Sequence, residues 1–364
     1  MEIKYLRTEK ATGACWKLGE KCRKEDLEMG FMKRTLAVSI GSNIRIPAAL
    51  LLITFLISAC SGIKTEAART LSVTGRNVAL QTQQNIFVSD KEYLRARDGE
   101  ALFHGFSGTT NSELYIKILK DYDSIHQELA KRSVVFEKLA DLYDAFGELA
   151  GLDAGEKTEK ALASLGGAIE EYSKQIKQPS PIYKDTTALI SKIGGLVAKE
   201  IQKAKIREAS IQIRARVEDI QKLLGNQLIR EQMEGFKESL TTVKKTAFVL
   251  MWGKGMYDPK PLLDAFGEDM GLVAKKDAAA GIKPDTPVGN ALLEVLDKRL
   301  AIKTDLIAKS YDASLRSFGA LITEHKKLEQ GMPLDLTRLH AIVAELRGIV
   351  VLLTKVKTDV SKDQ

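Results

Sequence analysis

Apolar residues recur at alternating steps of three and four in several segments of this chain, and that repeat restricts the fold more than any other feature. A 3.5-residue repeat is the seam of a helix that packs lengthwise against another helix. The sequence therefore predicts long helices, each burying one stripe. The run nearest the C-terminus has all seven places filled: Leu339, Ile342, Leu346, Ile349, Leu353, Val356 and Val360.

A longer seam is expected over residues 112–150, and its one exception is charged. Ten of its eleven places are apolar, and Arg132 occupies the other. Such a charge is expected either to pair with a carboxylate across the bundle or to extend its head to solvent. Pairing would set helix register rather than catalyse a reaction. The apolar places are Tyr115, Ile118, Tyr122, Ile125, Leu129, Phe136, Leu139, Tyr143, Phe146 and Ala150.

Capping residues and glycines mark the expected helix boundaries. Capping-box patterns begin at Ser89 and at Thr110, and Thr286-Pro287 places proline in a first helical turn. Gly194-Gly195, Gly225 and Gly235 are the expected weak points of a segment over 183–252. The predicted fold is an all-α, extended antiparallel bundle of long helices with coiled-coil-like seams. Its helices are expected over 89–104, 112–150, 153–177, 183–252 in two or three pieces, 287–329 and a C-terminal stretch from about 339.

The segment before the bundle has the order of charges and apolar residues that is typical of an export signal. Met32-Lys33-Arg34 is positively charged, and a fourteen-residue apolar run occupies 46–59. A membrane span needs about 20 such residues, so the run indicates a signal peptide. It ends in Ile57-Ser58-Ala59-Cys60. This end resembles the bacterial lipobox, in which an aliphatic residue and two small residues precede the cysteine that receives diacylglycerol.

The resemblance to a bacterial lipoprotein precursor covers about thirty residues and implies a role for each lipobox residue. Ile57, Ser58 and Ala59 would be recognised by the signal peptidase, and Cys60 would carry three acyl chains after cleavage. Ser61 in the following position favours the outer membrane over the inner membrane. No family is recognised for the body of the chain.

This interpretation divides the chain into four parts. We expect 1–31 to precede the true start of translation, at Met32 or Met29, and 32–59 to be the lipoprotein signal peptide. Residues 60–88 are then the lipidated cysteine and a tether. A helical bundle domain follows over 89–364, with an irregular insertion at about 253–287.

The charge balance argues against nucleic acid as a partner. Residues 1–59 hold ten of the 55 Lys/Arg and six of the 48 Asp/Glu. The remainder, with 45 basic and 42 acidic residues, carries a formal charge of only +3, too balanced for a nucleic-acid-binding surface. Cysteine use follows the same division, because Cys15 and Cys22 lie near the start and none follows Cys60.

Few patterns in the chain indicate chemistry. The histidines have no second ligand at helical spacing, so neither a metal site nor a cofactor is predicted. They are His104, His126, His325 and His340.

The expected function is that of a membrane-anchored, periplasm-facing lipoprotein, a binding or scaffold component of the cell envelope and not an enzyme. Its seams would take envelope proteins or a second copy as partners. One alternative is an envelope enzyme that acts on peptidoglycan through Asp258, Asp264 or Glu268. The other is a lipid or small-ligand carrier that uses space between helices.

Overall fold

The computed structural model describes residues 64–151, 155–181, 198–256, 258–260 and 281–355. All of them belong to a compact unit that comprises Ser58–Gln364. The described residues form helices and their connections and contain no β-strand, which confirms the predicted all-α bundle. The helices are α2 (Thr65–Ser107), α3 (Glu113–Leu149), α4 (Gly155–Gln175), α5 (Ala198–Leu224), α6 (Gln227–Gly253), α8 (Pro287–Glu329) and α9 (Thr337–Lys355).

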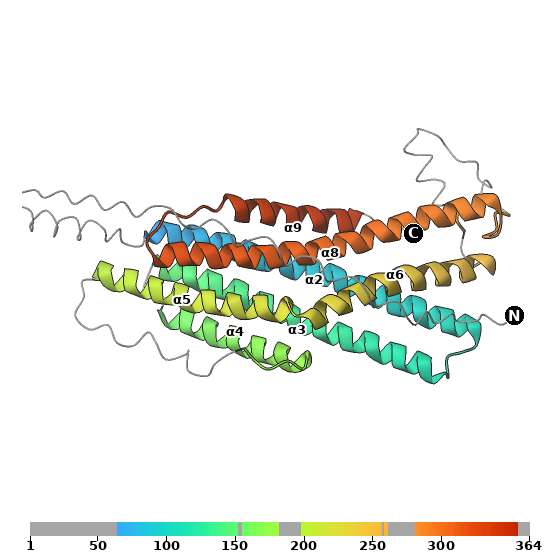
Figure 1. The fold of residues 1–364 in the computed structure, drawn as a ribbon, viewed down its shortest axis with the longest axis horizontal. Helices are drawn as coiled ribbons and strands as arrows, with labels where there is room; N and C mark the ends of the chain where they lie inside the picture. Colours follow the sequence, from blue (N-terminus) through green and yellow to red (C-terminus); the bar gives the residue numbers. More distant parts are fainter. Residues whose placement is uncertain (1–63, 152–154, 182–197, 257, 261–280, 356–364) are drawn as a thin grey trace, which may run out of the picture. The chain divides into compact units, whose positions relative to one another are not determined.

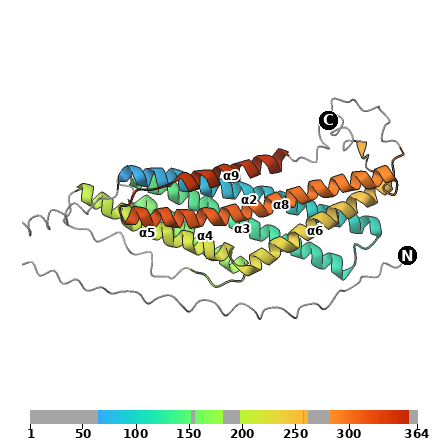
Figure 2. The same cartoon turned by 45° about the horizontal axis from the view of Figure 1, so that its top comes forward.

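The longest helices, α2 and α8, have 43 residues each and lie side by side with α3 and the α5–α6 pair (Figures 1 and 2). At 1.5 Å per residue, a helix of this length spans about 65 Å. Helices α2 and α3 run antiparallel, as do α8 and α9, whereas α6 continues along the bundle in the direction of α5. Each of two shorter helices packs on two others: α9 packs on α2 and α8, and α4 packs on α3 and α5.

The two predicted seams lie on the buried faces of their helices. In α3 and its C-cap, Arg132 and every apolar seam position from Leu129 to Ala150 are buried, whereas Tyr115, Ile118 and Ile125 are half-buried. In α9, the five seam positions from Leu339 to Leu353 are buried, whereas Val356 and Val360 lie outside the described residues. The 3.5-residue repeat was therefore a correct guide to the core.

The prediction that 60–88 forms a tether was wrong for its described part, because α2 begins at Thr65 and runs unbroken through Ser89. The helical repeat was not recognised because small and polar residues, rather than large apolar ones, occupy the face of α2 that packs against α3. A Cβ on Gly75 would lie 2.3 Å from a ring carbon of Tyr143. Ser72 Oγ donates a 2.7 Å hydrogen bond to the carbonyl oxygen of Tyr143. Small side chains thus bring α2 close to α3, and the bundle starts about 24 residues before the expected boundary.

Of the three helix starts predicted from capping residues, the one at Thr286 was confirmed and those at Ser89 and Thr110 were wrong. Thr286 caps α8 and accepts a 3.1 Å hydrogen bond from the Gly289 amide, as its position before Pro287 predicted. The expected cap at Ser89 was wrong, because its hydroxyl donates to the Asn85 carbonyl oxygen inside α2. For α3 the cap is Ser112 rather than Thr110.

The predicted weak points between 183 and 252 had different outcomes. The chain breaks between α5 and α6 at Gly225, as expected. Gly235 lies within the continuous helix α6, so the break expected there was wrong. Gly194 and Gly195 lie outside the described residues.

Candidate functional site

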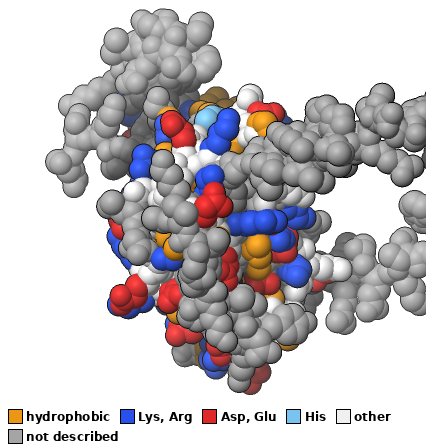
Figure 3. Space-filling view, turned by 90° about the vertical axis from the view of Figure 1, so that its left-hand side faces the viewer, with side chains coloured by type: hydrophobic (Ala, Val, Ile, Leu, Met, Phe, Trp, Pro, Cys, Tyr) orange, Lys and Arg blue, Asp and Glu red, His pale blue; other side chains and the backbone are white. Residues whose placement is uncertain are grey.

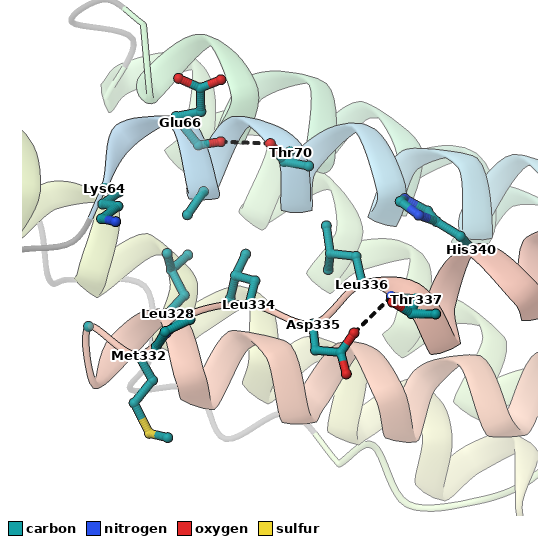
Figure 4. Close-up of a pocket in the computed structure, with 13 residues that line it drawn as sticks. Lys64, Glu66, Thr70, Leu328, Met332, Leu334, Asp335, Leu336, Thr337 and His340 are labelled. Carbon is teal, nitrogen blue, oxygen red and sulfur yellow. Dashed lines mark hydrogen bonds between the residues drawn. The ribbon is translucent and has the colours of Figure 1, made fainter.

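An open groove of about 770 Å³ lies where α2 begins. Its walls are the first two turns of α2, the last turn of α8, the connection from 331 to 336 and the first turn of α9 (Figure 4). Clefts of 300–1,000 Å³ are the usual size for small-ligand sites. The lining residues are Lys64, Glu66, Ala67, Thr70, Leu328, Gly331, Met332, Pro333, Leu334, Asp335, Leu336, Thr337 and His340.

The α8–α9 connection creates the groove because it leaves α8 abruptly. Gly331 adopts a positive φ of 70°, and the Met332 amide donates back to the Lys327 carbonyl oxygen at 2.8 Å. Pro333 follows and cannot continue a helix. The connection to α9 therefore crosses the end of the bundle as irregular chain, which packs less closely against α2 than a helix would.

The inner surface of the groove is apolar. Leu328 is only 1% exposed and Leu336 is also buried. Leu334 is partly buried and packs against the main core, as does Ala67 of α2. In Figure 4, Leu328 and Leu334 extend towards α2, whereas Met332 extends the other way.

Polar groups lie at the rim, and local hydrogen bonds already engage several of them. The Thr70 hydroxyl donates to the Glu66 carbonyl oxygen at 2.9 Å. Asp335 accepts from the Thr337 amide at 3.2 Å, and its hydrogen bonds with Thr337 hold the pKa of its carboxyl below the ordinary value. On this end of the molecule, the described surface mixes Lys/Arg with Asp/Glu (Figure 3). The rim therefore has no excess of one charge that would attract an oppositely charged ligand.

A second, much smaller cavity of about 30 Å³ lies in the middle of the bundle. Two buried polar atoms on its wall, Thr82 Oγ1 and Asn85 Oδ1, have no hydrogen-bond partner among the described residues. Buried polar groups are normally paired, so this wall is an exception.

Beside this cavity, charged groups are buried in pairs. Arg132 donates to Glu128 at 2.5 Å, and the Tyr172 hydroxyl from α4 donates to the same carboxylate at 2.8 Å. Burial opposes the charge on Arg132, but the interactions with Glu128 and Tyr172 together outweigh that cost and raise the pKa of the guanidinium. Lys303 of α8 pairs with Glu92 of α2 at 2.7 Å. The expectation for Arg132 was partly right: it pairs with a carboxylate, but on its own helix.

Another buried cluster is neutral and joins three helices. Tyr143 of α3 and Ser210 of α5 make hydrogen bonds of 3.0 and 2.8 Å to the two ring nitrogens of His325 on α8. Burial, followed by the nearby charge of Arg214, lowers the pKa of His325 from 6.5 to about 3. The imidazole is therefore neutral at physiological pH, and its hydrogen bonds connect α3, α5 and α8.

Of the residues that the sequence singled out for chemistry, only Asp258 lies in the part of the chain that the structure describes. Ile57, Ser58, Ala59 and Cys60 lie outside the described residues, as do Asp264 and Glu268. Asp258 is exposed, and its carboxylate accepts from the Lys260 amide at 2.9 Å. Within the described ranges, no three His, Cys, Asp or Glu side chains are grouped to hold a metal ion.

Sequence reasoning missed the groove, although Gly331 and Pro333 marked its connection. A cavity between segments as distant as Ala67 and Leu334 depends on how α2 docks against α8, which no local pattern encodes.

Comparison with known proteins gives no match: no family model matches the sequence, and no curated protein or solved structure is similar to it. The described part of the chain defines a class, the all-α helical bundle with lengthwise seams. None of its described helices is both long enough and apolar enough to cross a membrane.

Proposed function

We propose that the protein is a lipid-anchored component of a bacterial envelope that faces the periplasm from the outer membrane and acts as a binding or scaffold protein. The observation that carries this proposal is the order of its N-terminal features. A charged segment, a short apolar run and Ile57-Ser58-Ala59-Cys60 are followed within five residues by the first helix of the bundle.

The short link between Cys60 and the bundle supports an anchoring role. Lys64 is four residues after Cys60, and four extended residues span at most about 14 Å. Lipid on Cys60 would therefore hold the groove end of the bundle next to the membrane surface.

A row of apolar side chains along α2 supports a scaffold role. Val73, Leu80, Phe87 and Leu94 recur every seven residues. Val73 is 59% exposed and Phe87 is 50% exposed, although both side chains are apolar. Val73, Phe87 and Leu94 remain exposed, whereas Leu80 is partly buried against the core. Exposed apolar residues at heptad spacing are the form of surface that a partner helix covers.

The anchor is tested by Cys60→Ser, with Thr65→Ser, a conservative change five residues further along the chain, as the control. The expected result is that palmitate label and membrane fractionation are lost in Cys60→Ser and kept in Thr65→Ser. Equal labelling of both variants would overturn the anchor.

The scaffold role is tested by in-cell cross-linking of Phe87→Glu against Gln84→Glu, a control at an exposed polar position on the same helix. A reproducible cross-linked product with one envelope protein, or with a second copy, should disappear only in Phe87→Glu. Identical patterns in both variants would contradict a scaffold role for this row.

The groove favours a second candidate, a carrier of lipid or a small ligand. Its volume and its apolar inner surface fit such a ligand better than a polar substrate. Extraction of the purified protein with organic solvent, followed by mass spectrometry, tests this: a stoichiometric co-purifying molecule supports the carrier, and an empty extract contradicts it.

A further inference from the structure

We propose that the groove holds one acyl chain of the lipid carried by Cys60 of the same molecule. This inference rests on the proposed anchor and assigns the groove a ligand. The occupant is a part of this chain that lies outside the described residues, and the groove that receives it is built from described ones.

The chain between Cys60 and the groove is short. Lys64 lines the groove, and the lipidated cysteine lies four residues before it, within at most about 14 Å of extended chain. An acyl chain on Cys60 therefore starts near the mouth of the groove. Because occupant and groove are in one molecule, the effective concentration of this chain exceeds that of dissolved lipid.

The lining of the groove suits a hydrocarbon chain. Ala67, Leu328, Leu334 and Leu336 supply an aliphatic surface, and transfer of methylene groups from water to such a surface is favourable. The rim hydrogen bonds of Thr70 and Asp335 are satisfied within the protein. A hydrocarbon chain leaves those bonds intact, whereas a polar ligand would compete with them.

A triacylated cysteine carries more acyl chains than anchoring requires. The lipobox implies three chains on Cys60, and stable anchoring needs only two membrane-binding signals. One chain is therefore available to the groove while the others stay in the bilayer.

The experiment titrates the full-length Cys60→Ser protein, which lacks its own lipid, with the fluorescent fatty acid cis-parinaric acid. We expect one molecule to bind per chain. Thr70→Trp, made in the Cys60→Ser protein, places a large ring at an exposed position in the groove and should weaken binding at least tenfold. The matched control is Thr323→Trp, because Thr323 is also exposed and its hydroxyl also donates to the carbonyl four residues earlier.

The lipidated protein, exchanged out of detergent, supplies the decisive comparison. Its own acyl chain should occupy the groove, so parinaric acid should bind at least tenfold more weakly than to Cys60→Ser. Equal binding to both proteins overturns the proposal, as does no binding to Cys60→Ser or equal loss in both tryptophan variants.

Mass spectrometry of the N-terminal peptide separates this failure from failure of the anchor. An unmodified Cys60 in the wild-type protein overturns the proposed anchor itself. A lipidated Cys60 together with equal parinaric acid binding overturns the groove assignment alone.

Discussion

Two buried polar clusters in the same bundle solve the cost of burial differently. Around Arg132, full charges are buried and compensated by the Glu128 carboxylate and the Tyr172 hydroxyl. Around His325, neutral groups from three helices satisfy one another, and the imidazole stays uncharged. The stability of the first cluster depends on a specific partner for each charge. The stability of the second depends on burial, which keeps the imidazole unprotonated.

The difference predicts distinct responses to mutation and to acid. A buried charge that loses its partner cannot be rehydrated and is severely destabilising. A buried neutral histidine is instead sensitive to pH, because protonation requires unfolding or a charge in the core. Four changes, from the largest expected effect to the smallest, test this contrast.

Arg132→Met should cost the most, about 3–5 kcal/mol of unfolding free energy, because Glu128 would remain buried with its ion-pair partner removed. Chemical denaturation measures this loss. The double variant Arg132→Met, Glu128→Leu is the control and should recover much of it, since both charges are then absent. A double variant no more stable than the single one would show that packing, not charge compensation, dominates this cluster.

Gly75→Ala should cost about 3 kcal/mol, the upper end for overpacking, because the added methyl group overlaps the Tyr143 ring that bonds to His325. Gly105→Ala, in the same helix and with nothing within 4 Å of the added carbon, should instead raise stability by about 0.5–1 kcal/mol. Thermal unfolding of the pair measures both effects. Equal behaviour would mean that close α2–α3 packing does not position Tyr143.

Lowering the pH from 8 to 5 should remove about 2 kcal/mol of stability through His325. Its folded pKa of about 3 lies below the ordinary 6.5, so the unfolded chain takes up a proton first and is favoured as the pH falls through 6.5. Urea unfolding at several pH values measures this slope. His325→Gln should flatten it, and a slope unchanged by His325→Gln would place its origin elsewhere.

Thr82→Val should have the smallest effect, from neutral to about 1 kcal/mol stabilising, because the buried Thr82 hydroxyl has no hydrogen-bond partner among the described residues. Ser72→Ala is the contrasting change, since it removes a hydroxyl that is hydrogen-bonded to the Tyr143 carbonyl oxygen, and should lower stability by about 1 kcal/mol. Denaturation midpoints compare the two. A larger loss in Thr82→Val would contradict the assignment of its hydroxyl as unpaired.

Local patterns predicted much of the bundle because the signals were local. The seams of α3 and α9, the Thr286 cap and the break at Gly225 depend on residues within a few positions of one another. The first half of α2 was missed for the opposite reason: its small residues indicate a helix only once Tyr143 is known to pack against Gly75.

By itself, the sequence predicted the helical class and most helix boundaries, and it contains the lipobox-like motif on which the proposed anchor rests. Only the tertiary structure decided where buried charges find partners and where the groove forms. Arg132 donates a hydrogen bond to the hydroxyl of Tyr172, which lies 40 residues further along the chain. Ala67 and Leu334, which are far apart in the sequence, line the same groove. Such contacts depend on how whole helices dock, and helix docking is set by the fit of many side chains together rather than by any short pattern.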